Sequence, residues 1–127
     1  MGAAVADRKP VILCVDDELI PLTLRRSVLQ RAGYEVLAAS SGTEALEVLA
    51  TEPVDLVLTD LLMPGLSGTE LAREIRKRIP DVPIVLFSGV NELPDDASHA
   101  DLFISKVEGP AVMCQKIAEM LGRVQQP

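Results

Sequence analysis

Acidic side chains follow two separate apolar runs of this sequence. Asp16, Asp17 and Glu18 come directly after the run 11–15, and Asp60 follows the run 55–59. Carboxylates that gather at one place raise each other's pKa values unless a cation lies among them. A hard divalent ion such as Mg²⁺ relieves this repulsion, because it is usually held by one or two carboxylates and can also bridge phosphoryl oxygens.

A hydroxyl and an amine follow two further apolar runs, at Ser88 and Lys106. With a metal ion bound, one carboxylate oxygen of Asp60 stays available as a nucleophile, and aspartyl phosphates are an established class of covalent intermediate. The amine of Lys106 supplies a compact positive charge for the incoming oxygens, and the hydroxyl of Ser88 can donate a hydrogen bond to another. Together these residue types indicate phosphoryl transfer to Asp60.

The apolar runs alternate with amphipathic segments, which is typical of an α/β fold with a parallel sheet and helices on both faces. In such a doubly wound sheet, ligands bind beyond the carboxyl ends of the strands, so the acids, the hydroxyl and the amine are expected to meet at one edge. The five predicted strands are 11–15, 35–39, 55–59, 83–87 and 101–105.

Between the first two strands, Ile20, Leu24 and Val28 recur at four-residue steps, with Pro21 in the opening turn and Gly33 as a stop, which predicts a helix. Three other segments also show helix signals. These are a segment that begins with a capping box at Ser41 and Glu44, a segment over 67–79 with Leu71, Ile75 and Ile79 on one stripe, and a segment from about Pro110 that buries Met113, Ile117, Met120 and Leu121.

Residues 91–100 form the weak fourth helix of the pattern. They contain Pro94, two aspartates, Ser98 and His99 and show little apolar periodicity, so a short or irregular helix is expected. Residues 1–9 are predicted to be a flexible arm, 10–123 a single domain, and 124–127 a tail.

The composition narrows the choice of function. The chain has 127 residues, 48% of them hydrophobic, so one compact domain is expected. Its formal net charge of −7 repels phosphate groups, so direct binding to nucleic acid or to an anionic membrane is not expected. Arg73, Arg76, Lys77 and Arg78 are interleaved with glutamates and are interpreted as a solvated helix face. Cys14 lies in an apolar run and Cys114 in a helical pattern; with no membrane span predicted, this indicates a cytoplasmic protein with reduced thiols.

Four motifs in order resemble the receiver domain of bacterial response regulators. They are Asp16-Asp17-Glu18, Asp60-Leu61-Leu62-Met63-Pro64 with Gly68, Ser88-Gly89, and Lys106, and the resemblance covers about residues 10–122. It implies a flavodoxin-like sheet with strand order 2-1-3-4-5 and a two-component signalling role.

The resemblance also implies a role for each motif residue. Asp60 is the expected phosphoacceptor, and Mg²⁺, or Mn²⁺ in its place, is expected on Asp17, Asp60, the backbone carbonyl of Leu62 and, largely through water, Asp16. Lys106 is expected to contact the phosphoryl group. Such a domain assists its own phosphorylation and dephosphorylation but has no separate turnover substrate, so it is not expected to be an enzyme in the usual sense.

The expected switch residues are Ser88, whose hydroxyl moves toward the phosphoryl group, and Phe103, whose ring turns inward. Their movement is expected to remodel the face made by the fourth helix, the fifth strand and the fifth helix, which is also where a homodimer is expected if one forms. The implied partners are a sensor histidine kinase or phosphotransfer protein and an unidentified downstream protein.

The chain departs from the usual receiver pattern in three places. Val107 follows the lysine where a proline is common, the interval from Ser88 to Lys106 is short, and the apolar residues Leu62 and Val90 occupy positions that line the route of the hydrolytic water. The apolar pair leads to the hypothesis of a long-lived phosphoaspartate.

Several other interpretations stay open. Asp16 and Asp17 could cap the first helix, Ser88 could satisfy a turn amide, and Phe103 could be core filler. The main alternative for the whole chain is a pseudo-receiver that binds proteins without being phosphorylated. A phosphatase with an aspartyl nucleophile would want a second acid at Leu62, and a flavin carrier would not place three acids after its first strand.

Overall fold

The computed structural model describes residues 8–89 and 99–125, with side chains described as far as residue 122. Its centre is a five-stranded parallel sheet with the order β2-β1-β3-β4-β5, which confirms the predicted topology. The strands are β1 (Val11–Val15), β2 (Glu35–Ala39), β3 (Leu56–Asp60), β4 (Ile84–Ser88) and β5 (Leu102–Ser105). β3 and β4 both begin and end one residue later than the sequence predicts, so Asp60 and Ser88 are the final residues of these strands. β5 begins one residue later but ends as predicted.

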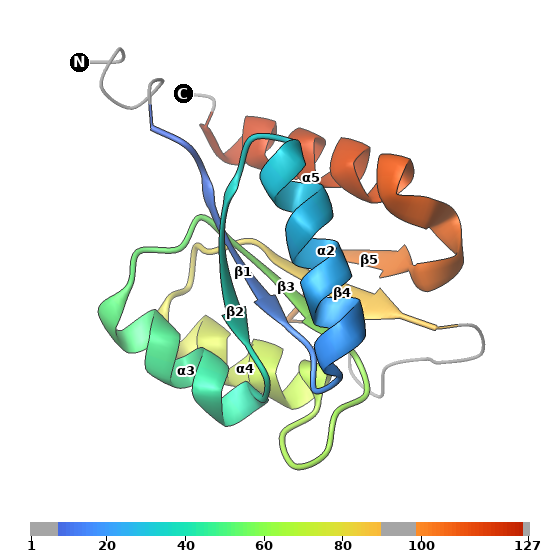
Figure 1. The fold of residues 1–127 in the computed structure, drawn as a ribbon. Helices are drawn as coiled ribbons and strands as arrows, with labels where there is room; N and C mark the ends of the chain where they lie inside the picture. The colour runs from blue at the N-terminus through green and yellow to red at the C-terminus, as the bar shows by residue number, and fades with distance from the viewer. Residues whose placement is uncertain (1–7, 90–98, 126–127) are drawn as a thin grey trace.

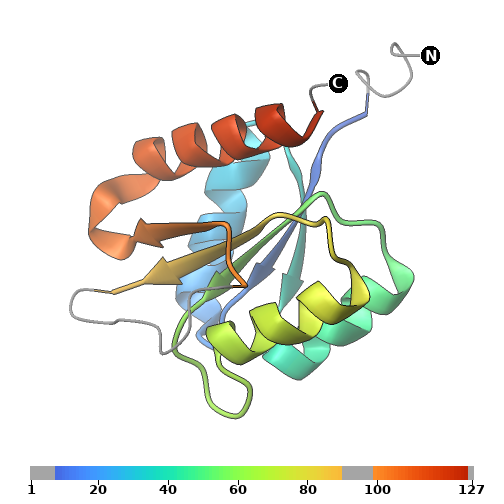
Figure 2. The same ribbon diagram turned by 180° about the vertical axis from the view of Figure 1, so that it is seen from behind.

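Helices cover both faces of the sheet (Figures 1 and 2). On one face lie α2 (Leu19–Arg31) and α5 (Gly109–Gln125), and on the other lie α3 (Gly42–Thr51) and α4 (Gly68–Arg78). A short 3-10 helix, η1 (Lys106–Glu108), connects β5 to α5. Residues 90–98, which contain most of the expected fourth helix and Val90, lie outside the described residues.

The central strands are apolar throughout because both of their faces are covered. Along β1, Ile12 and Cys14 join the core cluster under α2 and α5, whereas Leu13 and Val15 join the cluster under α3 and α4. This alternation follows from the two-residue period of a strand. It fixes the register of β1, and with it the position at which Asp16 leaves the sheet.

The helix over residues 19–31 is confirmed, but its regular apolar spacing does not mark its buried face. Ile20 is 73% exposed and Leu24 is 64% exposed. The buried positions of α2 are Leu22, Arg25 and Leu29, which also lie three and four residues apart. A charged residue therefore occupies the middle of the buried stripe.

The helix caps explain where α3 and α4 begin. The hydroxyl of Ser41 accepts a hydrogen bond from the Glu44 N–H at 3.0 Å, as predicted, but the Glu44 carboxylate accepts from the Ser40 N–H instead of completing the box at Ser41. A full capping box does form at α4 between Ser67 and Glu70. This box anchors the start of α4 beside the end of β3.

Arg76 corrects the interpretation of the basic group on α4 as a solvated face. Lys77 does pair with Glu74 at 3.3 Å on the surface. The Arg76 guanidinium instead donates to the carbonyls of Pro80, Val82 and His99, and it pairs with Asp101 at 2.8 Å. Arg76 therefore ties the end of α4 to the segments that enter β4 and β5.

A second ion pair lies at the same amino-terminal end of the parallel sheet, where β1 and β3 begin. Arg8 donates to both carboxylate oxygens of Asp55 at 3.0 and 3.1 Å, and the Val11 N–H donates to the same carboxylate at 2.7 Å. Burial raises the pKa of Asp55, but the hydrogen bonds and the charge of Arg8 outweigh it and leave that pKa below its ordinary value.

Candidate functional site

The acidic residues gather at the carboxyl end of the sheet, as expected from the strand order. Asp60 is the last residue of β3 and is 3% exposed, and Asp16 directly follows β1 and is 1% exposed. Asp17 lies beside them on the surface. One carboxylate oxygen from each of the three lies within 4.8 Å of the others, which is close enough for a shared cation.

The donor set fits a hard divalent ion. Three carboxylates offer oxygen ligands, which suit Mg²⁺ and Mn²⁺ better than softer metals. Asp60 Oδ1 is moreover a buried oxygen without a hydrogen-bond donor of acceptable geometry, so part of its bonding capacity is left unused by the protein. Asp16, Asp17 and Asp60 are therefore the residues of the described chain that could hold such an ion.

Lys106 reaches the same carboxylate from the end of β5. Its Nζ lies 2.6 Å from Asp60 Oδ1, and its side chain is one-third exposed. This contact is an ion pair, because Oδ1 lacks a well-directed hydrogen bond. The turn that follows is held by Ser105, whose hydroxyl accepts from the Val107 N–H, so a valine after the lysine still lets the amine reach Asp60.

The electrostatics of Asp60 are finely balanced. Burial raises the pKa of Asp60 above its ordinary value, and the close contact and positive charge of Lys106 only partly offset this effect. The negative charge of Asp16 raises the pKa of Asp60 further, whereas the positive charge of Arg25 lowers the pKa of Asp60. An additional cation beside Asp60 would therefore favour its ionised, nucleophilic form.

Asp16 has two partners within the protein. Its Oδ1 accepts a hydrogen bond from the Glu18 N–H at 2.9 Å, but Glu18 is itself the N-cap of α2 and no side chain caps this helix, so the helix-capping alternative is wrong. Its Oδ2 accepts from Arg25 Nη1 at 3.1 Å in a buried ion pair. Asp16 thus helps to shape the start of α2 and also contributes to the acidic cluster.

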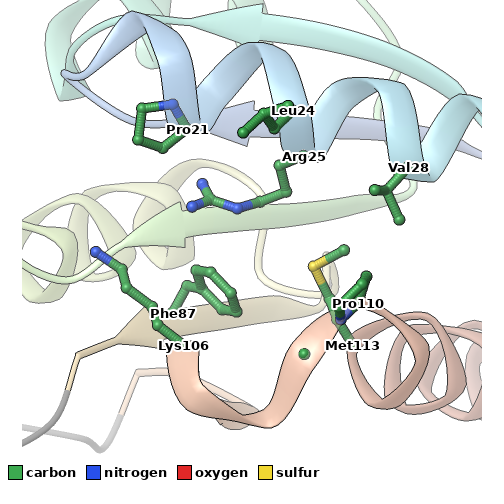
Figure 3. A pocket seen from close by; sticks show the side chains of 9 residues that line it. Pro21, Leu24, Arg25, Val28, Phe87, Lys106, Pro110 and Met113 are labelled. Atoms are coloured by element: carbon green, nitrogen blue, oxygen red, sulfur yellow. The ribbon is translucent and has the colours of Figure 1, made fainter.

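Arg25 is a residue of the site that was not predicted from the sequence. Its guanidinium carbon lies 4.3 Å from the centre of the Phe87 ring, and its side chain is 7% exposed. Figure 3 shows Arg25 above Phe87, at the wall of a cavity of about 330 Å³ that lies between α2 and the start of α5. The available signal was the placement of Arg25 between Leu22 and Leu29 on one helical stripe.

The remaining predicted residues lie at or near this edge. Ser88 ends β4, the strand next to β3, and is half-buried. Phe103 is a half-buried residue of β5. Its neighbours Leu102 and Ile104 pack on the side of the sheet covered by α2 and α5. Because strand residues alternate, Phe103 faces the opposite side of the sheet. The Leu62 side chain, two residues beyond Asp60, is 57% exposed.

Gly68 explains how α4 can begin so close to Asp60. A Cβ atom at this position would lie 2.3 Å from the Asp60 carbonyl oxygen and 2.9 Å from the Leu61 Cα. The Gly68 N–H donates to the Leu61 carbonyl at 2.8 Å. The absence of a side chain at Gly68 therefore sets the position of the β3–α4 loop, which contains Leu62.

The chain is similar to curated proteins that are about twice its length. It is 34% identical over 116 residues to the alkaline phosphatase synthesis transcriptional regulatory protein PhoP of Bacillus subtilis, covering 88% of this chain and 48% of PhoP. It is 32% identical over 123 residues to the probable transcriptional regulator ycf27 of Cyanophora paradoxa, covering 94% of this chain and 51% of that protein. The chain thus spans about half the length of these relatives.

Solved structures match it over nearly their whole length. A response regulator receiver domain protein from Clostridium thermocellum superposes with a TM-score of 0.83 at 32% identity, covering 90% of this chain and 95% of that one. The response regulator TrrA from Thermotoga maritima, crystallised in complex with Mg²⁺-BeF, gives a TM-score of 0.82 at 35% identity, covering 87% and 98%.

A family model agrees with these likenesses. Residues 12–118 match the model described as the response regulator receiver domain, which includes every residue of the acidic cluster and Lys106. The fold, the strand order and the match over most of the chain show that the protein belongs to the response regulator receiver domain family of two-component signalling.

Proposed function

We propose that this receiver domain is a signalling switch that accepts a phosphoryl group on Asp60. The observation that carries the proposal is the ion pair between Lys106 Nζ and Asp60 Oδ1 at 2.6 Å, formed beside two further carboxylates. An ammonium group in this position offsets negative charge on the acceptor and on the incoming phosphoryl oxygens. Without it, three carboxylates would repel a phosphodonor.

The donor is a phosphohistidine of a sensor kinase or a phosphotransfer protein. A carboxylate oxygen of Asp60 forms a bond to phosphorus while the phosphorus–nitrogen bond of the donor breaks, and the imidazole leaves with the electron pair and takes up a proton. Lys106 stays bound to the acceptor side and contacts a phosphoryl oxygen. No other substrate is turned over, because the product remains attached to the domain.

A divalent ion belongs in the same proposal. Asp16, Asp17 and Asp60, with the backbone carbonyl of Leu62, are the residues that would hold Mg²⁺ or Mn²⁺. When bound, the ion supplies charge neutralisation and a template for the phosphoryl oxygens. The protein's own part is to keep the carboxylates close together at the end of the sheet.

The output of the switch is expected at the neighbouring strands. Ser88 lies at the end of β4, beside β3, and its hydroxyl would move toward the new phosphoryl group. Phe103, on β5, would turn inward and so change the surface formed by β5 and α5. We propose this surface for binding a downstream protein and for any phosphorylation-dependent dimer.

PhoP and ycf27 are described as transcriptional regulators, but this chain spans only about half of each. We propose that the receiver domain acts on its target through protein contacts, because its formal net charge of −7 repels nucleic acid. No α-helix in the described ranges, 8–89 and 99–125, is both long enough and apolar enough to cross a membrane.

One observation favours the alternative of a scaffold that is never phosphorylated. Asp16 already has a buried cationic partner in Arg25, so part of the cluster is neutralised without a metal ion. A domain that had lost its metal could be stabilised in this way. The pair of acids at Asp17 and Asp60 and the Lys106 contact argue for the switch.

Intact-mass measurement after incubation with a small acyl phosphate separates the two functions. We expect a phosphate-sized mass gain that requires Mg²⁺ and is absent from an Asp60→Asn variant. The matched control is Asp81→Asn, an exposed aspartate remote from the cluster, which should gain phosphate like the parent. A parent protein that gains no mass with Mg²⁺ present would favour the scaffold.

A further inference from the structure

Arg25 is a buried cation in contact with the proposed metal site. It is 7% exposed, and its partner Asp16 is 1% exposed. A buried charge is tolerated when it is paired, and the 3.1 Å contact between Arg25 Nη1 and Asp16 Oδ2 provides this pairing. The Phe87 ring, 4.3 Å from the guanidinium carbon, supports the same group from its other side.

The contact changes the charge that a metal ion would meet. The cluster contributes three carboxylates, and Lys106 and Arg25 contribute two positive charges in direct contact with it, so one net negative charge remains. Both oxygens of Asp16 are also engaged, one by Arg25 and one by the Glu18 N–H. The electrostatic attraction between the cluster and an arriving cation is therefore weaker, and both carboxylate oxygens of Asp16 already have other partners.

Arg25 is held in this position by its surroundings. Its stem leaves the buried stripe of α2 between Leu22 and Leu29. Figure 3 shows the side chain extending over Phe87, with Leu24 and Val28 on the same helix beside it. Swinging the guanidinium into solvent would break the ion pair and leave Asp16 buried without a countercharge.

We propose that Arg25 is a resident counter-ion that competes with the divalent ion and weakens its binding to the receiver domain. This inference rests on the proposed metal site at Asp16, Asp17 and Asp60. Its consequence is that the domain becomes competent for phosphorylation only at higher concentrations of divalent ion than a domain with an apolar residue at position 25. Arg25 acts through Asp16, so it is a positioning residue and takes no part in the transfer itself.

The test measures Mn²⁺ binding directly, without phosphorylation. Free Mn²⁺ gives an electron paramagnetic resonance signal that disappears on binding, so titration yields a dissociation constant. We expect Arg25→Met to bind Mn²⁺ at least about tenfold more tightly than the parent, because a like charge in a partly buried site is removed. Arg25→Lys keeps the charge and should stay near the parent value.

Two further variants keep the test decisive. Arg25→Gln removes the charge but keeps a hydrogen-bond donor for Asp16, so it guards against misfolding of the methionine variant, and it should also bind Mn²⁺ more tightly. Arg26→Met is the matched control, because Arg26 is the exposed neighbour on α2 and its loss changes the net charge equally. Its affinity should stay within about twofold of the parent value, since exposed charges are screened.

The outcomes separate this inference from the function on which it rests. Tighter binding by the neutral Arg25 variants, with the Arg25→Lys and Arg26→Met variants near the parent, supports the counter-ion role. Equal or weaker binding by folded Arg25→Met and Arg25→Gln, with the parent still binding Mn²⁺, would overturn it and leave the metal site intact. If no folded variant and no parent protein binds Mn²⁺, both the inference and the proposed metal site are wrong.

Discussion

Replacing Gly68 with alanine tests the link between α4 and the phosphoacceptor strand. The new Cβ would lie 2.3 Å from the Asp60 carbonyl oxygen, 2.9 Å from the Leu61 Cα and 3.1 Å from a Leu86 methyl group. Ordinary contacts begin near 3.4 Å, so the start of α4 and the end of β3 must separate by about 1 Å. Two of the three obstructing atoms belong to the backbone and cannot rotate away.

The expected destabilisation follows from that geometry. Overpacking a well-packed region generally costs about 1–3 kcal/mol, and a clash with backbone atoms falls at the upper end of that range. The displacement also lengthens the 2.8 Å hydrogen bond from the Gly68 N–H to the Leu61 carbonyl. We therefore expect Gly68→Ala to lower the free energy of unfolding by about 3 kcal/mol and to slow the phosphorylation of Asp60.

Urea unfolding followed by circular dichroism measures the change in stability. Gly122→Ala is the matched control, because Gly122 lies within α5 and a Cβ there meets no atom within 4 Å. The control should gain about 0.5 kcal/mol, since alanine favours a helix over glycine. Equal stability of Gly68→Ala and the parent would refute the proposed close packing at the site.

Three other changes have defined outcomes. Asp55→Asn should lower the free energy of unfolding by about 1–2 kcal/mol at pH 7. Because the pKa of Asp55 is lowered in the folded protein, the difference in unfolding free energy between parent and variant should vanish as the pH falls through that pKa. Urea unfolding over a pH series measures both effects. Leu62→Asn should shorten the lifetime of the phosphorylated domain, followed by intact mass; slower phosphate loss than the parent would contradict a water route beside Leu62. Arg76→Met should cost about 2 kcal/mol of stability because several carbonyls lose their donor, whereas exposed Arg73→Met should cost little.

Much of the site could be predicted because strand ends are visible in the sequence. Asp16, Asp60 and Lys106 each follow an apolar run, and a parallel sheet necessarily brings such positions to one edge. Their gathering at one edge of the sheet is therefore a consequence of topology. The one-residue shifts of β3 and β4 did not disturb this prediction, because side chains just before and just after a strand end remain at the same edge.

The two buried or bridging arginines could not be predicted in the same way. Arg25 and Arg76 lie within helices, and charged residues of helices usually face solvent. Only the three-dimensional packing places Asp16 and Phe87 beside Arg25. The same packing places several backbone carbonyls beside Arg76. Likewise, Ile20 and Leu24 satisfied a helical period while facing outward. A period establishes a helix, but its buried face depends on which neighbours the fold supplies.

The most direct test of the proposed switch is to locate the phosphoryl group. The phosphorylated domain is treated with borohydride, which reduces an acyl phosphate to an alcohol, and the peptides are then sequenced by mass spectrometry. We expect the reduced residue at position 60, dependent on both Mg²⁺ and the phosphodonor. Reduction at Asp16, Asp17 or any other position, or at none in a sample that has gained phosphate, would contradict the assignment of Asp60 as the phosphoacceptor.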